Sequence, residues 1–79
     1  MNHYLATFHT HLAALKTHRN LVSAGVKARM SPVPRKISSS CGTCVQYHAE
    51  HLHETCIDTD AEALYRLNGE EAELLKEFE

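Results

Sequence analysis

The hydrophobic and polar residues change period several times along the first half of the chain. Residues 3–8 alternate and include aromatic and β-branched side chains, a pattern that predicts a strand. After Thr10, a suitable helix N-cap, apolar residues recur at helical spacing as far as Gly25, which can end a helix. Residues 26–31 alternate again, and Pro32 ends this second strand. The strand–helix–strand order predicts a parallel pair with a right-handed crossover.

The segment after residue 42 fits two patterns. Apolar residues at helical spacing allow one helix over residues 40–56. Thr43, Val45 and Tyr47 also alternate and favour β structure, which predicts a strand over 43–48 followed by a short helix over 49–56. The periodicity alone leaves both alternatives open.

The pattern after residue 58 also allows more than one secondary structure. Thr59 and Glu62 have capping-box spacing, which predicts a helix over residues 60–67. Asn68-Gly69 then breaks whatever element precedes it. Residues 70–79 carry apolar side chains at helical spacing, and we expect them to form a short C-terminal helix.

Length and composition limit the class of protein. A chain of 79 residues makes a single domain, residues 1–79, with a thin core. Its 43% hydrophobic and 23% charged residues are typical of a soluble globular protein. We expect no membrane association and a cytoplasmic location, because no apolar run could span a bilayer and no cationic leader pattern opens the chain.

Charge and cysteine content narrow the function. The formal net charge of −2 argues against nucleic acid as a partner. The seven histidines make this charge sensitive to mildly acidic pH. Three cysteines, two of them only three residues apart, do not resemble a secreted disulfide framework and indicate a reactive or metal-ligating set in a reducing compartment.

The most unusual stretch is the segment from Pro32 to Cys44. It combines two prolines, the cations Arg35 and Lys36, three serines and a Cys-Gly pair at residues 41 and 42. Nearby positive charge and converging backbone N–H groups favour an ionised thiol. A flexible serine-rich connector with a chance cysteine is the alternative interpretation.

This stretch resembles the selenium/sulfur carrier-like family. The similarity rests on Pro-Val-Pro-Arg at residues 32–35 and Ile-Ser-Ser-Ser-Cys-Gly at residues 37–42, supported by Tyr-Leu-Ala-Thr-Phe at 4–8. It covers about residues 3–48. The resemblance favours the strand over 43–48 with a short helix over 49–56, and it places a strand rather than a helix at 62–67.

Together these elements predict an α+β fold. We expect a two-layer sandwich with ferredoxin-like βαββαβ order, in which two helices pack on one face of four strands and a short extra helix closes the C-terminus. The proline- and serine-rich loop would join the second and third strands at one end of the sheet.

The resemblance implies a carrier rather than an enzyme. Cys41 would hold sulfur or selenium as a persulfide or selenenylsulfide and exchange it with donating and accepting enzymes, without a cofactor. The predicted anion-stabilising groups are the cations and the small residues of the loop, namely Arg35, Lys36, Ser38, Ser39, Ser40 and Gly42. Cys44 is either a resolving thiol or a half-buried strand residue.

Two other functions stay open. Cys41 and Cys44 form a Cys-x-x-Cys pair, but the helix that usually activates the first thiol of a redox pair is doubtful here. Cys41, Cys44, His51 and Cys56 are the right ligand types for a small zinc-stabilised interaction module. On a short helix His48 and His51 would share a face that His53 does not join. The spacing of the four ligands departs from that of a zinc knuckle, and a chain with its own strand–helix–strand core need not rely on zinc, so we expect no metal.

Overall fold

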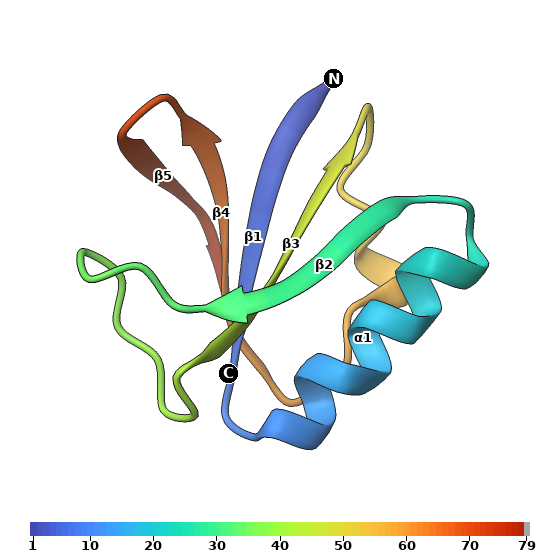
Figure 1. The fold of residues 1–79 in the computed structure, drawn as a ribbon, viewed down its shortest axis with the longest axis horizontal. Helices are drawn as coiled ribbons and strands as arrows, with labels where there is room; N and C mark the ends of the chain where they lie inside the picture. The colour runs from blue at the N-terminus through green and yellow to red at the C-terminus, as the bar shows by residue number, and fades with distance from the viewer. Residues whose placement is uncertain (79) are drawn as a thin grey trace.

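The computed structural model describes residues 1–78 as a five-stranded antiparallel sheet with one α-helix packed on one face (Figure 1). The strand order in the sheet is β2-β3-β1-β4-β5. The elements in chain order are β1 (Asn2–Phe8), α1 (His11–Ser23), β2 (Lys27–Pro32), β3 (Thr43–Ala49), the 3₁₀ turn η1 (Glu54–Cys56), β4 (Ala61–Asn68) and β5 (Glu71–Glu77).

The first half of the chain forms the predicted elements. The side chain of Thr10 caps α1 by accepting a hydrogen bond from the backbone N–H of Ala13 at 3.1 Å. Gly25, just beyond the helix, has a φ of 80°, a conformation that side chains with a Cβ rarely adopt. Within residues 1–78, no helix combines the length and the apolar character needed to cross a membrane.

The expected parallel pair is wrong as a hydrogen-bonded pair, although its two strands do run parallel. β1 and β2 are each antiparallel to β3, so they run in the same direction, but β3 lies between them in the sheet. β3 forms an antiparallel hydrogen-bonded ladder with β2 on one side and with β1 on the other. The helix therefore connects two strands that are separated by one strand position.

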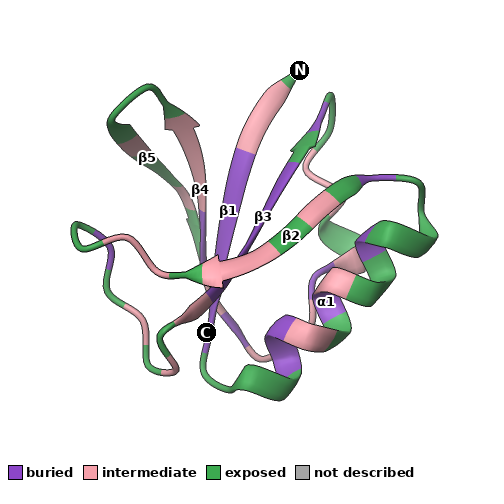
Figure 2. Cartoon of the chain, in the orientation of Figure 1, coloured by how far each residue is buried: buried purple, intermediate pink, exposed green. Residues whose placement is uncertain are grey.

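The sheet has a core on each face. The main core lies between the sheet and α1 and includes Phe8, Leu21, Val45 and Tyr47, all fully buried. A smaller core on the opposite face is formed by Leu5, Ile37 and Cys44, with partly buried side chains from the loop, β4 and β5 packed against it. Figure 2 shows the buried residues along the central strands β1 and β3, where both faces are covered.

The predicted second helix, over residues 49–56, is wrong. β3 continues to Ala49, and only the three residues of η1 are helical. His53 enters the turn with a φ of 53°, which a continuous helix does not allow. The hydroxyl of Tyr47 donates to the carbonyl of Leu52, so the segment turns back over the end of the main core. The βαββαβ order is thus matched only in part.

The predicted C-terminal helix is also wrong: residues 71–77 form β5, and no helix follows β4 within residues 1–78. The helix over residues 60–67 that the capping-box spacing of Thr59 and Glu62 predicts is wrong as well, because Ala61–Asn68 forms β4, in agreement with the strand that the resemblance places at 62–67. The register between β4 and β5 shifts between Leu64 and Tyr65, so that Leu75 is skipped in the pairing. This bulge lets Leu75 and Phe78 pack against the main core. Two residues of the apolar set that fits a helix stripe are therefore partly buried from a bulged strand, while Leu74 stays exposed.

Candidate functional site

The loop between β2 and β3 is folded and anchored. Its two ends meet where the N–H of Val33 donates to the carbonyl of Gly42 at 3.1 Å. The N–H of Ile37 donates to the carbonyl of Pro34 at 3.0 Å, and the Ile37 side chain is buried with Leu5 and Cys44 in the smaller core. The loop therefore covers the sheet face opposite α1 (Figure 1).

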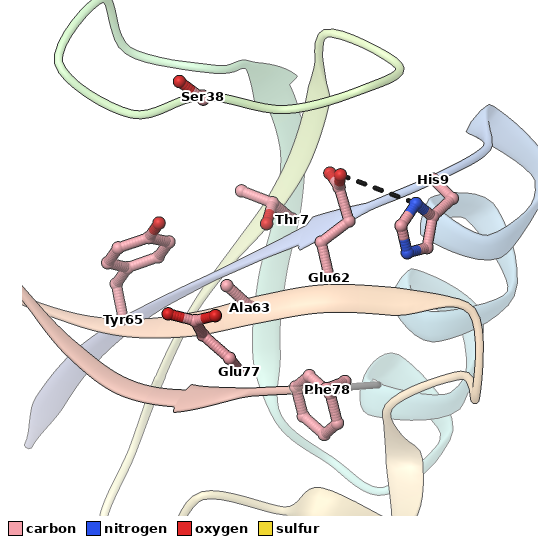
Figure 3. Close-up of a pocket in the computed structure, with 8 residues that line it drawn as sticks. All are labelled: Thr7, His9, Ser38, Glu62, Ala63, Tyr65, Glu77 and Phe78. Atoms are coloured by element: carbon pink, nitrogen blue, oxygen red, sulfur yellow. Dashed lines mark ion pairs between the residues drawn. The ribbon is translucent and has the colours of Figure 1, made fainter.

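The serines of the loop bind a carboxylate of the protein itself. The hydroxyl of Ser39 donates to Glu62 Oε1 at 3.1 Å and to the carbonyl of Phe8 at 3.2 Å. Ser40 donates its backbone N–H to Glu62 Oε1 at 3.0 Å and its hydroxyl to Glu62 Oε2 at 2.6 Å. His9 Nδ1 lies 3.5 Å from Glu62 Oε2, and a dashed line marks this contact in Figure 3. Glu62, which joins the loop to β4, was not singled out as a site residue from the sequence.

The protonation of Glu62 reflects these contacts. Partial burial alone would raise the pKa of its carboxyl group. The hydrogen bonds from Ser40 and Ser39, together with the charge of His9, outweigh that effect and lower the pKa below its ordinary value. The carboxylate is therefore held in its charged form as the anchor of the serine loop.

Cys41 follows the serines directly but is not among their partners. Its side chain is half-buried against the main core, and the thiol donates to the carbonyl of Thr43 at 3.4 Å. Arg35 and Lys36 are exposed at the tip of the loop, and neither side chain forms an ion pair or hydrogen bond with another residue of 1–78. Ser38 is also exposed. The structure thus places Cys41, its predicted cations and its predicted donors on one loop without bringing them into direct contact.

Cys44 occupies a different environment from Cys41. It is fully buried in the smaller core, while Cys41 packs against the main core on the α1 side. Both are free thiols. Burial raises the pKa of Cys44, an effect opposed by hydrogen bonds from Ser31 and Gln46 and by the charge of Arg29. Of the two interpretations of Cys44, that of a strand residue fits this environment, although the side chain is fully rather than half buried.

A chain of polar groups connects Cys44 to the surface. The Ser31 hydroxyl lies 3.3 Å from the Cys44 sulfur and accepts a hydrogen bond from Gln46 Nε2 at 3.0 Å. Gln46 Oε1 accepts from His3 Nε2 at 2.8 Å and from an Arg29 N–H at 3.4 Å. Sequence reasoning missed this chain, although strand alternation places these side chains on one face once the register is known.

The proposed zinc ligands are not gathered. In the part of the chain that the structure describes, no three His, Cys, Asp or Glu side chains lie close enough to hold a metal ion. Cys44 is buried on the face away from α1, and the Cys56 thiol donates to the carbonyl of Asn20 at 3.8 Å. The rings of His51 and His53 are arranged edge to face, with their centroids 6.4 Å apart.

Comparisons with known proteins show the family of the chain. A family model described as "Putative Se/S carrier protein-like" matches residues 3–59, which include the whole loop and all three cysteines. The chain belongs to this family. It is also 33% identical, over 45 residues, to "Uncharacterized protein YtiA" of Escherichia coli (strain K12), and this match covers 57% of the chain and 53% of that protein. No solved structure matches the chain.

Proposed function

We propose that this protein carries sulfur or selenium on Cys41 and delivers it to a partner enzyme. The observation that best supports Cys41 is the contrast between the two thiols of the loop region. Cys41 is partly exposed on the loop that the family model includes, whereas Cys44 is fully buried and has a raised pKa. A carrier thiol must be reached by both a donor and an acceptor, so Cys41 is the better candidate.

The transfer needs no redox partner. The Cys41 thiolate attacks the terminal sulfur of a donor persulfide, a Cys41–sulfur bond forms, and the donor sulfur–sulfur bond breaks to release the donor thiolate. A selenium atom attached to a donor sulfur would move in the same way and give a selenenylsulfide. Electrons and atoms balance, because one thiolate is exchanged for another.

The loop has a role in positioning this thiol. Ser39 and Ser40 fix the segment before Cys41 through Glu62, and Gly42, at a φ of 74°, turns the chain into β3. Arg35 and Lys36 at the exposed tip supply positive charge for the terminal anion of a persulfide and for an acidic partner surface. Ser38 stands on the same exposed segment.

The test is sulfur capture by the purified protein. The protein is incubated with glutathione persulfide, and peptide mass spectrometry then locates the added sulfur atom. We expect the gain on Cys41, its loss in Cys41→Ser, and its retention in the control Cys56→Ser, which removes another half-buried thiol. Cys41→Ser should keep the wild-type melting temperature, since the thiol makes only one long hydrogen bond.

Two results would contradict the proposal. Retention of the added sulfur in Cys41→Ser would assign the carrier role to another thiol. One zinc per chain, with masked thiols that a chelator releases as the protein unfolds, would replace the carrier by the zinc-stabilised module.

A further inference from the structure

A cavity of about 370 Å³ opens beside the loop, and Cys41 is not among the residues that line it. Figure 3 shows the lining side chains. Its walls come from β1, β4, β5 and the loop segment at Ser38. Thr7, Ala63 and Glu77 are directly opposite one another across three strands, so they share one face of the sheet. Ala63, in the middle of this row, carries only a methyl group, which leaves space between its larger neighbours.

Thr7 indicates that the cavity is built for a ligand. Its side chain is fully buried, and its hydroxyl oxygen has no hydrogen-bond partner among the described residues. The hydroxyl is directed into the space between Tyr65, Glu77 and Glu62 (Figure 3). Because buried polar groups are almost always hydrogen-bonded, an unpartnered hydroxyl on a cavity wall points to a missing partner atom in the cavity.

The charge of the cavity defines that partner. Glu62 is already engaged by the serines and His9, whereas Glu77 makes no ion pair or side-chain hydrogen bond with any other residue of 1–78. One free carboxylate and two hydroxyls, from Thr7 and Tyr65, therefore face the cavity from three different strands. All three can accept a hydrogen bond.

We propose that this cavity binds a small organic ammonium ion. A primary ammonium group has three donors arranged around one nitrogen, which match acceptors on three walls. Its alkyl group would pack against Ala63 and Phe78. The volume suits a small ligand, and the described residues offer no set of three metal-binding side chains that could favour a metal ion instead.

The experiment is a titration of the full chain with n-butylammonium, monitored by NMR chemical shifts. The neutral analogue 1-butanol tests the charge, and butyrate tests its sign. We expect saturable shifts at Thr7, Ala63 and Tyr65 with butylammonium only. Glu77→Gln should weaken binding about tenfold or more, because it removes a charge-assisted hydrogen bond. Glu71→Gln, an exposed position on the same strand outside the cavity, is the matched control and should bind normally.

Thr7→Val gives a second test in which two readouts move in opposite directions. The change keeps the shape of the side chain and removes the unpartnered hydroxyl, so the melting temperature should rise while butylammonium binding weakens several-fold. Equal binding of 1-butanol and butylammonium, or unchanged affinity in both folded variants, would overturn the proposal. Sulfur capture and amine binding are separate measurements, so either proposal can fail without the other.

Discussion

Glu62 illustrates how a single residue changes the interpretation of a motif. The three serines before Cys41 are predicted donors for a sulfur anion, yet two of them donate to the carboxylate of Glu62 on β4. Such an internal anion holds the loop closed without any ligand. Two of the serines are therefore engaged by Glu62, and in the proposed transfer the exposed cations Arg35 and Lys36 would be the groups that meet an incoming anion.

Replacing this carboxylate should loosen the loop specifically. We expect Glu62→Ala to lower the free energy of unfolding by about 1–3 kcal/mol, because the three hydrogen bonds from Ser39 and Ser40 are lost at a partly exposed site. Hydrogen exchange should show lost protection at the Ser40 amide. Glu54→Ala, which removes an exposed ion pair with Lys76, is the control and should leave that amide protected. Unchanged Ser40 exchange in Glu62→Ala would contradict the anchoring role.

The burial of Cys44 predicts low reactivity. With iodoacetamide at neutral pH, we expect Cys44 to be alkylated at least roughly tenfold more slowly than Cys41, because it must wait for an opening of the fold and its pKa is raised. Peptide mapping over time measures the three rates separately, and Cys56 serves as the second accessible thiol. Equal rates for Cys44 and Cys56 would mean that the smaller core opens freely.

At the scale of elements, local pattern was sufficient for the first half of the chain. β1, α1 and β2 have clear periods, a capping threonine and a terminating glycine or proline, so tertiary contacts did not need to be known. β3 follows from its alternation together with the family resemblance. The loop carrying Cys41 could be placed between β2 and β3 for the same reason.

In the second half, the strand over 62–67 that the resemblance implies is confirmed as β4, whereas the helices predicted from local periodicity are wrong because long-range strand pairing determines this part of the fold. Leu74, Leu75 and Phe78 fit the face of a helix, but the chain instead extends the sheet beside β4, with a bulge that turns Leu75 to the main core. The spacing of Thr59 and Glu62 is that of a capping box, but residues 61–68 form β4 and Glu62 binds the loop instead. Because these contacts join residues that are far apart in the sequence, no local pattern predicts them, and for the same reason the sequence does not predict the cavity beside Glu62.

Across the whole molecule, the two edges of the sheet differ in charge. Lys27 and Arg29 lie on the edge strand β2, near His3 and His48, whereas the opposite edge strand β5 is rich in glutamate. Partial loss of hydration is the main reason that the pKa of His48 is lowered, and the positive charges around it add to the effect. The largest of these charge effects on His48 comes from His3, whose ring is stacked on that of His48 with centroids 4.2 Å apart.

The lowered pKa values of His48 and Glu62 predict two separate losses of stability in acid. His48 binds its proton more weakly in the folded protein than in the unfolded chain, so stability falls as the pH drops below the ordinary value of 6.5 and through the lowered pKa. Glu62 also has a lowered pKa, so its contribution is complete above the ordinary value of 4.5 and is lost as the pH falls through the folded value. The two effects have the same sign but occupy different pH ranges.

The melting temperature measured from pH 8 to pH 3 can separate these ranges. The difference between wild type and His48→Gln should change mainly below pH 6.5, because only the wild type then carries the disfavoured proton. The difference between wild type and Glu62→Ala should stay constant down to about pH 4.5 and shrink below it, as the wild-type carboxylate loses its charge. If both variants gave curves parallel to wild type over the whole range, neither group would be coupled to folding, and the charged anchor of the loop would have to be replaced by neutral hydrogen bonding.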